Sequence, residues 1–428
     1  MKIVRRLAEF VQKITGGLRV PDQRFVDDCV KRMVRHRSTM LTEIGRALLE
    51  KIPLIKTVTR LSRMASSTHF DDERLRKNFV AEVAPLTKRE LPIVAVDLTE
   101  LAKPYAKDME DLCQVRDASS RRSREEGGGN RRGGSRRKPA TGCATKNPKK
   151  SKDARRTRAK KAEIVPGYWV FEAVLTALDK HIIVPLLTEV FSTVTPGFKS
   201  QNDVIEHWLR YLAQSVSKTA LWLFDRGFDG GYILKVLCDP DLQLRWVVRM
   251  VGTRNVEFQE ESRQMKALAA GLDLPHTTMV STRGKGSRDR MHSVRFGFIP
   301  VHIKDIPEQR GLVVAHMGRS RRIMLLCWKL PANPKEAAQL LRAYLRRWGA
   351  EDSARAVKQL CGAEDVRVQT LRAVARLVRL AAMALAWLCL LLLLAPVTAG
   401  KIMARAKTVG KEPLLPVYRM SEGLRPAR

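Results

Sequence analysis

The sequence is short of acidic residues and of closely spaced cysteines. Its 44 Asp and Glu residues are outnumbered by 79 Lys and Arg residues, which leaves a formal net charge of +35. The seven cysteines include no close pair, which argues against a zinc knuckle and a dense disulfide framework, so we expect reduced thiols. Aromatic residues make up only 6% of the chain, but hydrophobic residues reach 44%, which excludes wholesale disorder.

The amino terminus also lacks a secretory signal, because its basic residues are not followed by a long apolar stretch with a small-residue cleavage site. We therefore expect a cytoplasmic protein. One long apolar run does occur at residues 380–395, between Arg379 and Lys401. It is shorter than the roughly 20 residues that a membrane span needs, and cations flank both ends. A buried core helix is therefore favoured over a membrane helix, and we expect no membrane association.

The excess of positive charge predicts a polyanionic partner. Nucleic acid is the leading candidate, because each phosphate that Lys or Arg neutralises releases counterions and so adds sequence-independent affinity. A ribosomal or membrane-surface protein could carry the same charge. At 428 residues the chain is long enough for two or three folded units with a buried core.

The amino-terminal part of the chain is predicted to be helical. Apolar residues recur at three- and four-residue spacing in RFVDDCVKRMVRHR and in ERLRKNFVAEV. The basic residues on the other faces of these helices fit contact with DNA and simple solvent exposure equally well. The run LPIVAVDL (91–98) then predicts a buried strand that ends in an acidic position, and YWVFEAVLTAL predicts a second strand.

A low-complexity segment lies between these two strands. Residues 121–161 hold 17 Lys or Arg residues against 3 acidic residues, a net charge of +14, with glycine runs among them. Such a composition is typical of a disordered basic loop, which could tether DNA nonspecifically or be a tolerated surface insertion.

The rest of the chain alternates helices and strands. A helix at 201–218 precedes the buried strand TALWLFD, which ends at Asp225. Residues 242–330 are rich in β signals separated by turns and predict antiparallel sheet. Residues 334–360 predict one long helix with Pro334 in its first turn.

Three acidic residues stand out as candidates for chemistry. Asp97 and Asp225 each end a predicted buried strand, and Glu351 lies on the long helix. Convergent carboxylates bind hard cations, and a pair of Mg²⁺ ions can activate an attacking oxygen and stabilise the leaving oxygen of a phosphodiester. With 44 acidic residues in the chain, this triplet alone is weak evidence.

The long helix adds a second pattern. Tyr344, Arg347, Glu351 and Lys358 stand at positions i, i+3, i+7 and i+14, which places them within roughly 60° of one another on one helical face. A carboxylate flanked by cations suits a site that grips phosphates around a scissile bond, although an ordinary solvated face would look the same.

These residues carry a family resemblance. YLRRWGAEDSARAVK matches Tyr-x2-Arg-x3-Glu-x6-Lys, the signature of a large group of bacterial insertion-sequence transposases with an Asp-Asp-Glu active site. The segments VAVDLTELAKPYAKDMEDLCQVRD and LFDRGFDG are similar to the family's first- and second-aspartate regions. Such transposases place a β-strand insertion between the second Asp and the Glu, as residues 242–330 independently predict. The resemblance covers about residues 90–395.

The resemblance implies an α/β protein with an RNase H-like catalytic core, a β-rich insertion and an α-helical amino-terminal region. The expected parts are a region that binds DNA ends, the first part of the core with a basic insertion, the β-strand insertion, the helices that complete the core, and a basic tail. Their bounds in that order are 1–90, 91–240 with the basic insertion at 118–163, 241–330, 331–400 and 401–428.

The resemblance also implies roles for single residues. Asp97, Asp225 and Glu351 would bind two Mg²⁺ ions, for which Mn²⁺ can substitute. Tyr344, Arg347 and Lys358 would contact or orient DNA near the cleaved end, and Arg226 is a further candidate for a phosphate contact. These are the residues expected to cut the transposon end with a metal-activated water and then join the freed 3′-hydroxyl to target DNA.

The expected partners are the terminal inverted repeats of the transposon and target DNA, bound by a homodimer in the nucleoid. Some relatives pass through a DNA hairpin and hold a flipped base with a tryptophan. Trp246 and Trp328 are candidates for that role, although core positions are favoured for both. The alternatives are a noncatalytic DNA-binding derivative of a transposase and an RNase H-like nuclease that cuts without strand transfer.

Overall fold

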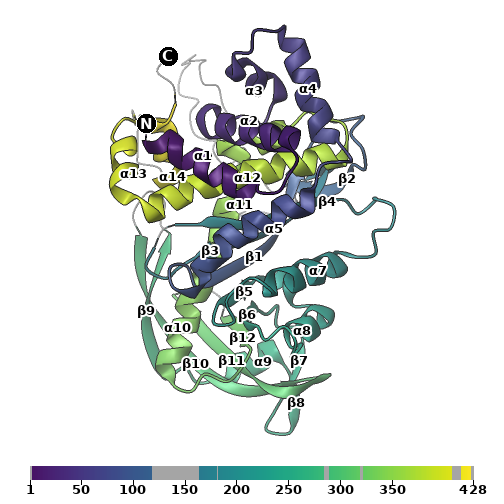
Figure 1. Ribbon diagram of the computed structural model, residues 1–428. Coiled ribbons are helices and arrows are strands. Elements are labelled where there is room, and N and C mark those ends of the chain that lie inside the picture. Colours follow the sequence, from purple (N-terminus) through teal and green to yellow (C-terminus); the bar gives the residue numbers. More distant parts are fainter. Residues whose placement is uncertain are drawn as a thin grey trace, which may run out of the picture.

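The computed structural model describes residues 2–117, 163–180, 182–283, 289–318, 322–406 and 416–425. The basic insertion expected at 118–163 lies outside these ranges except for Glu163, which begins a strand. Figure 1 shows a group of helices above a large twisted sheet that extends downward into a β-rich region. The protein is thus a mixed α/β fold with amino-terminal helices, as expected from the sequence.

The amino-terminal region is helical, which confirms the prediction from apolar spacing. Its helices bury the apolar side of each pattern, for example Phe25, Cys29 and Met33 in α2. Asp71 caps α5, because its side chain accepts a hydrogen bond from the backbone N–H of Arg74 at 2.8 Å. The elements are α1 (Lys2–Ile14), α2 (Val20–His36), α3 (Leu41–Leu48), α4 (Leu54–Ser66), α5 (Asp72–Val83) and the 3-10 helix η1 (Ala84–Lys88).

The core sheet has the strand arrangement of an RNase H-like fold. Its strands lie side by side in the order β4, β3, β1, β5 and β6. β1 is antiparallel to β3 but parallel to β5, and β5 is parallel to β6. The strands are β1 (Ile93–Ala102), β2 (Cys113–Asp117), β3 (Glu163–Thr176), β4 (Val184–Phe191), β5 (Leu221–Phe224) and β6 (Arg245–Arg249), with α7 (Gln201–Ala213), η3 (Arg226–Phe228) and α8 (Gly231–Leu237) among them.

The segment predicted to be a β-rich insertion does consist mainly of strands, but the insertion begins later than predicted and includes a helix. β6 pairs in parallel with β5 and so belongs to the core, and one helix interrupts the strands that follow. The insertion continues the core sheet, because β12 pairs antiparallel with β6. Its elements are β7 (Asn255–Phe258), β8 (Glu261–Gln264), α9 (Met265–Gly271), β9 (His276–Arg283), β10 (Asp289–Ile303), β11 (Ile306–Met317) and β12 (Ile323–Cys327).

The single helix predicted for residues 334–360 is wrong, since two helices occupy this segment. Between them the backbone N–H groups of Arg346 and Arg347 donate to the carbonyls three residues earlier, at 2.8 and 3.0 Å, which is 3-10 rather than α-helical bonding. Gly349, a poor helix former, follows the break. The carboxy-terminal elements are α10 (Pro334–Leu345), α11 (Trp348–Leu360), η4 (Ala363–Asp365), α12 (Leu371–Leu394), α13 (Pro396–Met403) and α14 (Pro416–Gly423).

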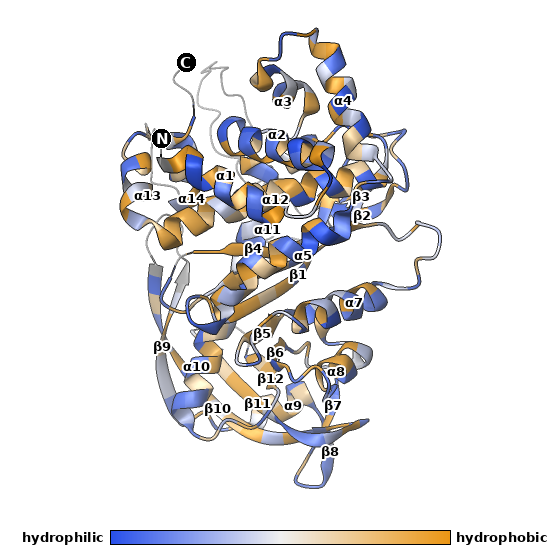
Figure 2. Cartoon of the chain, in the orientation of Figure 1, coloured by the Kyte–Doolittle hydropathy of each residue, from blue (hydrophilic) through white to orange (hydrophobic). Residues whose placement is uncertain are grey.

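Helix α12 contains the long apolar run and is a core helix, as the sequence analysis favoured. It is long and apolar enough to cross a membrane, but 83% of its most apolar 18-residue window is buried inside the protein. It packs against β4, α2, α4 and α11. Figure 2 shows α12 and the central strands mostly in orange, the colour of hydrophobic residues.

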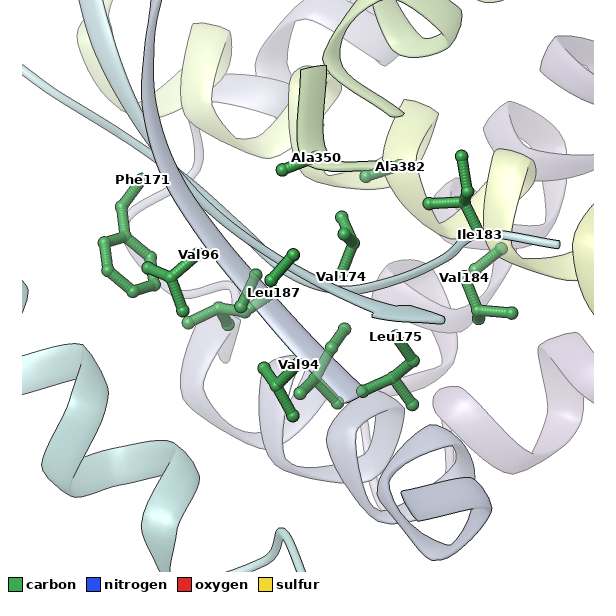
Figure 3. Packing of buried hydrophobic residues seen from close by; sticks show 14 of the residues in the cluster. Val94, Val96, Phe171, Val174, Leu175, Ile183, Val184, Leu187, Ala350 and Ala382 are labelled. Carbon is green, nitrogen blue, oxygen red and sulfur yellow. The ribbon is translucent and has the colours of Figure 1, made fainter. Parts of the chain in front are cut away.

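Helices cover both faces of the sheet at the core. Figure 3 shows Ala350 of α11 and Ala382 of α12 on the side of the strands where Val174 lies, whereas Val94 and Leu175 point to the opposite side. In β1 the residues alternate between these faces, so Asp97 shares the α11 face with Ala95. The fold thereby places Asp97 and helix α11, which contains Glu351, on the same side of the sheet.

Candidate active site

The two aspartates lie where the parallel strands β1 and β5 separate. Ala95 pairs with Leu223, so in the same register Asp97 lies opposite Asp225, the residue directly after β5. The expectation that β1 ends near Asp97 is wrong, because β1 continues to Ala102 through its antiparallel pairing with β3. Only the parallel pairing of β1 with β5 ends near Asp97, and this pairing is sufficient to bring Asp97 and Asp225 together.

Asp225 is held by the turn that follows it. Its Oδ1 accepts a hydrogen bond from the backbone N–H of Gly227 at 2.6 Å, and this contact fixes the first turn of η3. The second aspartate of LFDRGFDG has a different role, since Asp229 accepts bonds from the backbone N–H of Val251 and from Arg254 Nε. Asp229 therefore anchors the chain after β6, and Asp225 retains a carboxylate oxygen for other partners.

Helix α11 supplies the third carboxylate, Glu351, and the residue before the helix, Arg347, supplies a cation. Arg347 Nη2 donates to Glu351 Oε1 at 2.8 Å, and Arg347 Nη1 lies 3.5 Å from Asp97 Oδ2. The Arg347 side chain is 8% exposed, against 17% for that of Asp97 and 44% for that of Glu351. The structure thus brings Asp97, Arg347 and Glu351 together, with the arginine between the two carboxylates.

Negative charge at this site is only partly compensated. Burial raises the pKa of Asp97 to about 7, the nearby Arg347 lowers it, and the carboxylates of Asp225 and Glu351 raise it further. A buried carboxyl group with two acidic neighbours and one cation is short of positive charge, and divalent cations would provide what is missing.

The residues present fit Mg²⁺ or Mn²⁺ in their chemistry. All the donors are carboxylate oxygens, which these hard cations prefer. Within the described ranges, no three Asp, Glu, His or Cys side chains are gathered closely enough to form a metal centre as they stand. Between Asp97 and Glu351 the guanidinium of Arg347 contacts both carboxylates.

The remaining signature residues occupy different environments. Tyr344 belongs to α10, is buried, and its hydroxyl has no hydrogen-bond partner among the described residues. Lys358 lies between two carboxylates, with Nζ at 3.2 Å from Glu100 Oε1 and 3.4 Å from Glu364 Oε1. The single helical face inferred for these residues does not exist as a continuous surface, because the helix is broken beside Arg347.

The other candidates differ in exposure. Arg226 is exposed next to Asp225, which leaves its guanidinium accessible to a phosphate. Trp246 is buried in β6, as the core interpretation predicted. Trp328 directly follows β12 and is half-buried, with Arg245 and Lys329 over its ring at 5.1 and 5.8 Å.

Glu172 is a residue of this region that the sequence analysis did not identify. It pairs with Asp97 across β1 and β3 and is fully buried. Ser353 Oγ of α11 donates to its Oε1 at 2.8 Å, while Oε2 has no partner among the described residues. Burial raises the pKa of Glu172 to about 8. The signal was an acidic residue inside an otherwise apolar strand, YWVFEAVLT, because such a residue needs a specific partner.

Comparison with known proteins identifies the domain. Residues 176–387 match the family described as Transposase DDE domain, and this range includes Asp225 and Glu351, with Asp97 before it. No curated protein sequence matches the chain. The cryo-EM structure of the piggyBac transposase synaptic complex with hairpin DNA is similar over 99% of this chain and 77% of that chain, with 9% sequence identity and a TM-score of 0.41. Residues 176–387 are therefore similar to transposase DDE domains.

Proposed function

We propose that the protein is a cut-and-paste transposase of the bacterial insertion-sequence group. The observation that carries the proposal is the placement of Asp97, Asp225 and Glu351 at one edge of the RNase H-like core, in and beside a transposase DDE domain. The Tyr-x2-Arg-x3-Glu-x6-Lys spacing supports membership of that group. The net charge of +35 supports DNA as the substrate.

In this proposal Asp97, Asp225 and Glu351 hold two Mg²⁺ ions, or Mn²⁺ in their place, which would activate the attacking oxygen and stabilise the leaving oxygen. Arg347 exchanges its two carboxylate partners for a DNA phosphate when those carboxylates become ligands. Arg226 neutralises a second phosphate beside Asp225. Tyr344 and Lys358 orient the DNA end from the two sides of the helix break.

Two displacements at phosphorus account for the strand that is cut and joined to the target. In the first, a water oxygen bonds to the phosphorus at the transposon boundary, and the transposon strand leaves with a free 3′-hydroxyl. In the second, that hydroxyl attacks a target phosphodiester and displaces the 3′-oxygen of the target strand. Neither step requires a covalent bond to the enzyme. We propose that a homodimer performs both steps on two terminal inverted repeats, in the nucleoid of the cytoplasm.

One observation favours a second candidate function. Arg347 bridges Asp97 and Glu351 in the manner of a permanent counterion, as would suit a DNA-binding derivative that no longer cuts. Such a protein would bind DNA in a salt-sensitive manner with no cleavage in any metal.

The test is cleavage of a labelled duplex that carries the terminal repeat flanking the gene, here termed the end duplex. We expect cutting at the repeat boundary with Mg²⁺, none with EDTA, and none with the Asp225→Asn variant. Asp241→Asn is the matched control, because Asp241 is an exposed aspartate outside the site, and this variant should cut like the wild type. Binding without cutting in every metal would instead favour the noncatalytic derivative.

A further inference from the structure

Helix α4 lies at the periphery of the molecule. Figure 1 shows α3 and α4 at the top, beyond α2 and away from the sheet. One side of α4 is buried through Thr57, Leu61 and Ala65, which recur every four residues and face the neighbouring helices. The opposite side of α4 is not covered by any described part of the chain.

The uncovered face of α4 combines cations, a hydroxyl and one apolar side chain. Ile55, Lys56, Thr59 and Arg63 are all exposed, with Ile55 at 69%. At about 100° per residue these four positions fall within roughly 100° of one another. They line a depression along the helix, and α4 contains no acidic residue. The face is therefore suited to a surface that is both negatively charged and rich in hydrogen-bonding groups.

The cations of this face are free, whereas the acidic groups around them are engaged. Neither the side chain of Lys56 nor that of Arg63 has a hydrogen-bond or ion-pair partner among the described residues. Every acidic residue of the segment 20–66 already forms an ion pair, and the pairs are Asp22 with Arg19, Asp27 with Lys31, Asp28 with Arg24 and Arg60, Glu43 with Arg46, and Glu50 with Arg24 and Arg60. The positive charges of Lys56 and Arg63 are thus directed outward without internal compensation, whereas Arg60 of the same helix is paired.

Helix α3 supports α4 closely. The two helices are joined by residues 49–53, and a Cβ on Gly45 of α3 would lie 3.0 Å from Leu54 Cδ1 and 3.4 Å from Thr57 Cγ2. Glycine permits this approach. Two short helices joined by a turn, with the second presenting its outer face to solvent, have the layout of helix-turn-helix units that bind DNA.

We propose that α4 is the helix that reads the terminal repeat, inserted in the major groove of the DNA. Lys56 and Arg63 supply donors for guanine, Thr59 supplies a hydroxyl for a base edge, and Ile55 supplies an apolar contact for a thymine methyl group. The depth and width of the major groove accept one α-helix. This assignment rests on the proposed function, because it presumes that the protein acts on defined DNA ends.

The test compares two duplexes and two single-cation variants of the full chain. Fluorescence anisotropy would give the Kd for the end duplex and for a scrambled duplex of the same composition, with Arg63→Ala and with Lys77→Ala. Lys77 of α5 is the matched control, because it is also exposed and has no partner among the described residues. Both residues are on the surface, so both variants should fold, and circular dichroism would verify this.

We expect Arg63→Ala to weaken binding to the end duplex about tenfold or more and to change binding to the scrambled duplex far less. Lys77→Ala should affect both duplexes equally and weakly. Equal losses on both duplexes with Arg63→Ala would reduce α4 to a nonspecific phosphate contact and overturn the assignment.

The same set of proteins separates this inference from the function on which it rests. If the wild type cuts the end duplex at its boundary while Arg63→Ala retains full preference for it, only the role of α4 is refuted. If the wild type neither prefers nor cuts the end duplex, the transposase proposal fails, and the assignment of α4 fails with it.

Discussion

Two clusters of buried charged side chains differ in how far arginines neutralise their carboxylates. One cluster joins α5, β4 and α12. Its central residue is Arg379, which contacts both Glu189 and Asp72 at 2.6 Å. Arg76 forms a second ion pair with Glu189, and Arg376 forms a second ion pair with Asp72. The arginines hold the pKa values of Asp72 and Glu189 below their usual range in spite of burial. This cluster is fully paired, so it stabilises one arrangement of the chain.

The cluster at the candidate active site is instead short of positive charge. Asp97 and Glu351 share one arginine, and Asp225 has no ion pair among the described residues. The pKa values of Asp97 and the adjacent Glu172 are raised to about 7 and about 8. The comparison suggests a physical distinction between the two clusters. A structural cluster includes its own counterions, whereas a catalytic cluster leaves charge for cations and phosphates to complete.

The largest effect on stability should come from the paired cluster. Glu189→Gln leaves the guanidinium groups of Arg76 and Arg379 buried without their carboxylate, which should lower the free energy of unfolding by about 3–5 kcal/mol. Urea denaturation would measure the change. The exposed pair Arg74–Asp71 is the control. Arg74→Ala leaves the Asp71 helix cap in place, so its loss should stay below about 1 kcal/mol. Similar small losses in both variants would contradict the distinction.

Replacing Glu172 should instead raise the free energy of unfolding, and the size of this effect should depend on pH. Its folded pKa of about 8 lies above the ordinary value of 4.5, so the folded protein retains a proton that the unfolded chain loses. The stability from this group is complete below pH 4.5 and is lost as pH rises to about 8. Glu172→Gln should therefore stabilise the metal-free protein at pH 9 by several kcal/mol, at about 1.4 kcal/mol per pKa unit, and change little at pH 4. Thermal unfolding at both pH values would show this, and a variant that is less stable at pH 9 would refute it.

Arg347 tests whether the active-site arginine competes with cations. Arg347→Gln removes the only arginine that contacts both Asp97 and Glu351 among the described residues, so Mn²⁺ should bind the DNA-free protein several-fold more tightly. Cleavage of the end duplex should nevertheless fall, because a phosphate contact is lost. Titration calorimetry and the cleavage assay together distinguish this from simple misfolding, which would weaken both.

Tyr344 should give the smallest change in stability. Its buried hydroxyl has no partner among the described residues, so Tyr344→Phe should alter the free energy of unfolding by less than about 1 kcal/mol. If the hydroxyl orients DNA, as the family resemblance implies, the same variant should slow cleavage of the end duplex. Loss of stability without loss of cleavage would make Tyr344 a core residue only.

Local patterns in the sequence were sufficient to predict much of the core. Asp225 follows an apolar run that does become a short buried strand, and Asp97 lies in another that pairs with it. Apolar spacing also predicted the amino-terminal helices and the burial of residues 380–395. These features depend on neighbours within a few residues, which a sequence pattern records directly.

Features that depend on distant partners could not be predicted in this way. The family resemblance predicts that Lys358 contacts DNA, but the sequence does not reveal its neighbours Glu100 and Glu364, because these are set by how β1 and η4 meet α11. The partners of Glu189 lie 113 and 190 residues away in the chain. The break between α10 and α11 was also missed, because helical spacing continues across it and only Gly349 hinted at weakness.

The most direct test of the central claim is calorimetric titration of Mn²⁺ into the full-length protein bound to the end duplex. The uncompensated charge of Asp97, Asp225 and Glu351 predicts binding that Asp97→Asn and Asp225→Asn each weaken strongly, whereas the control Asp241→Asn leaves it unchanged. Equal Mn²⁺ affinity in all four proteins would show that these carboxylates do not form the metal site.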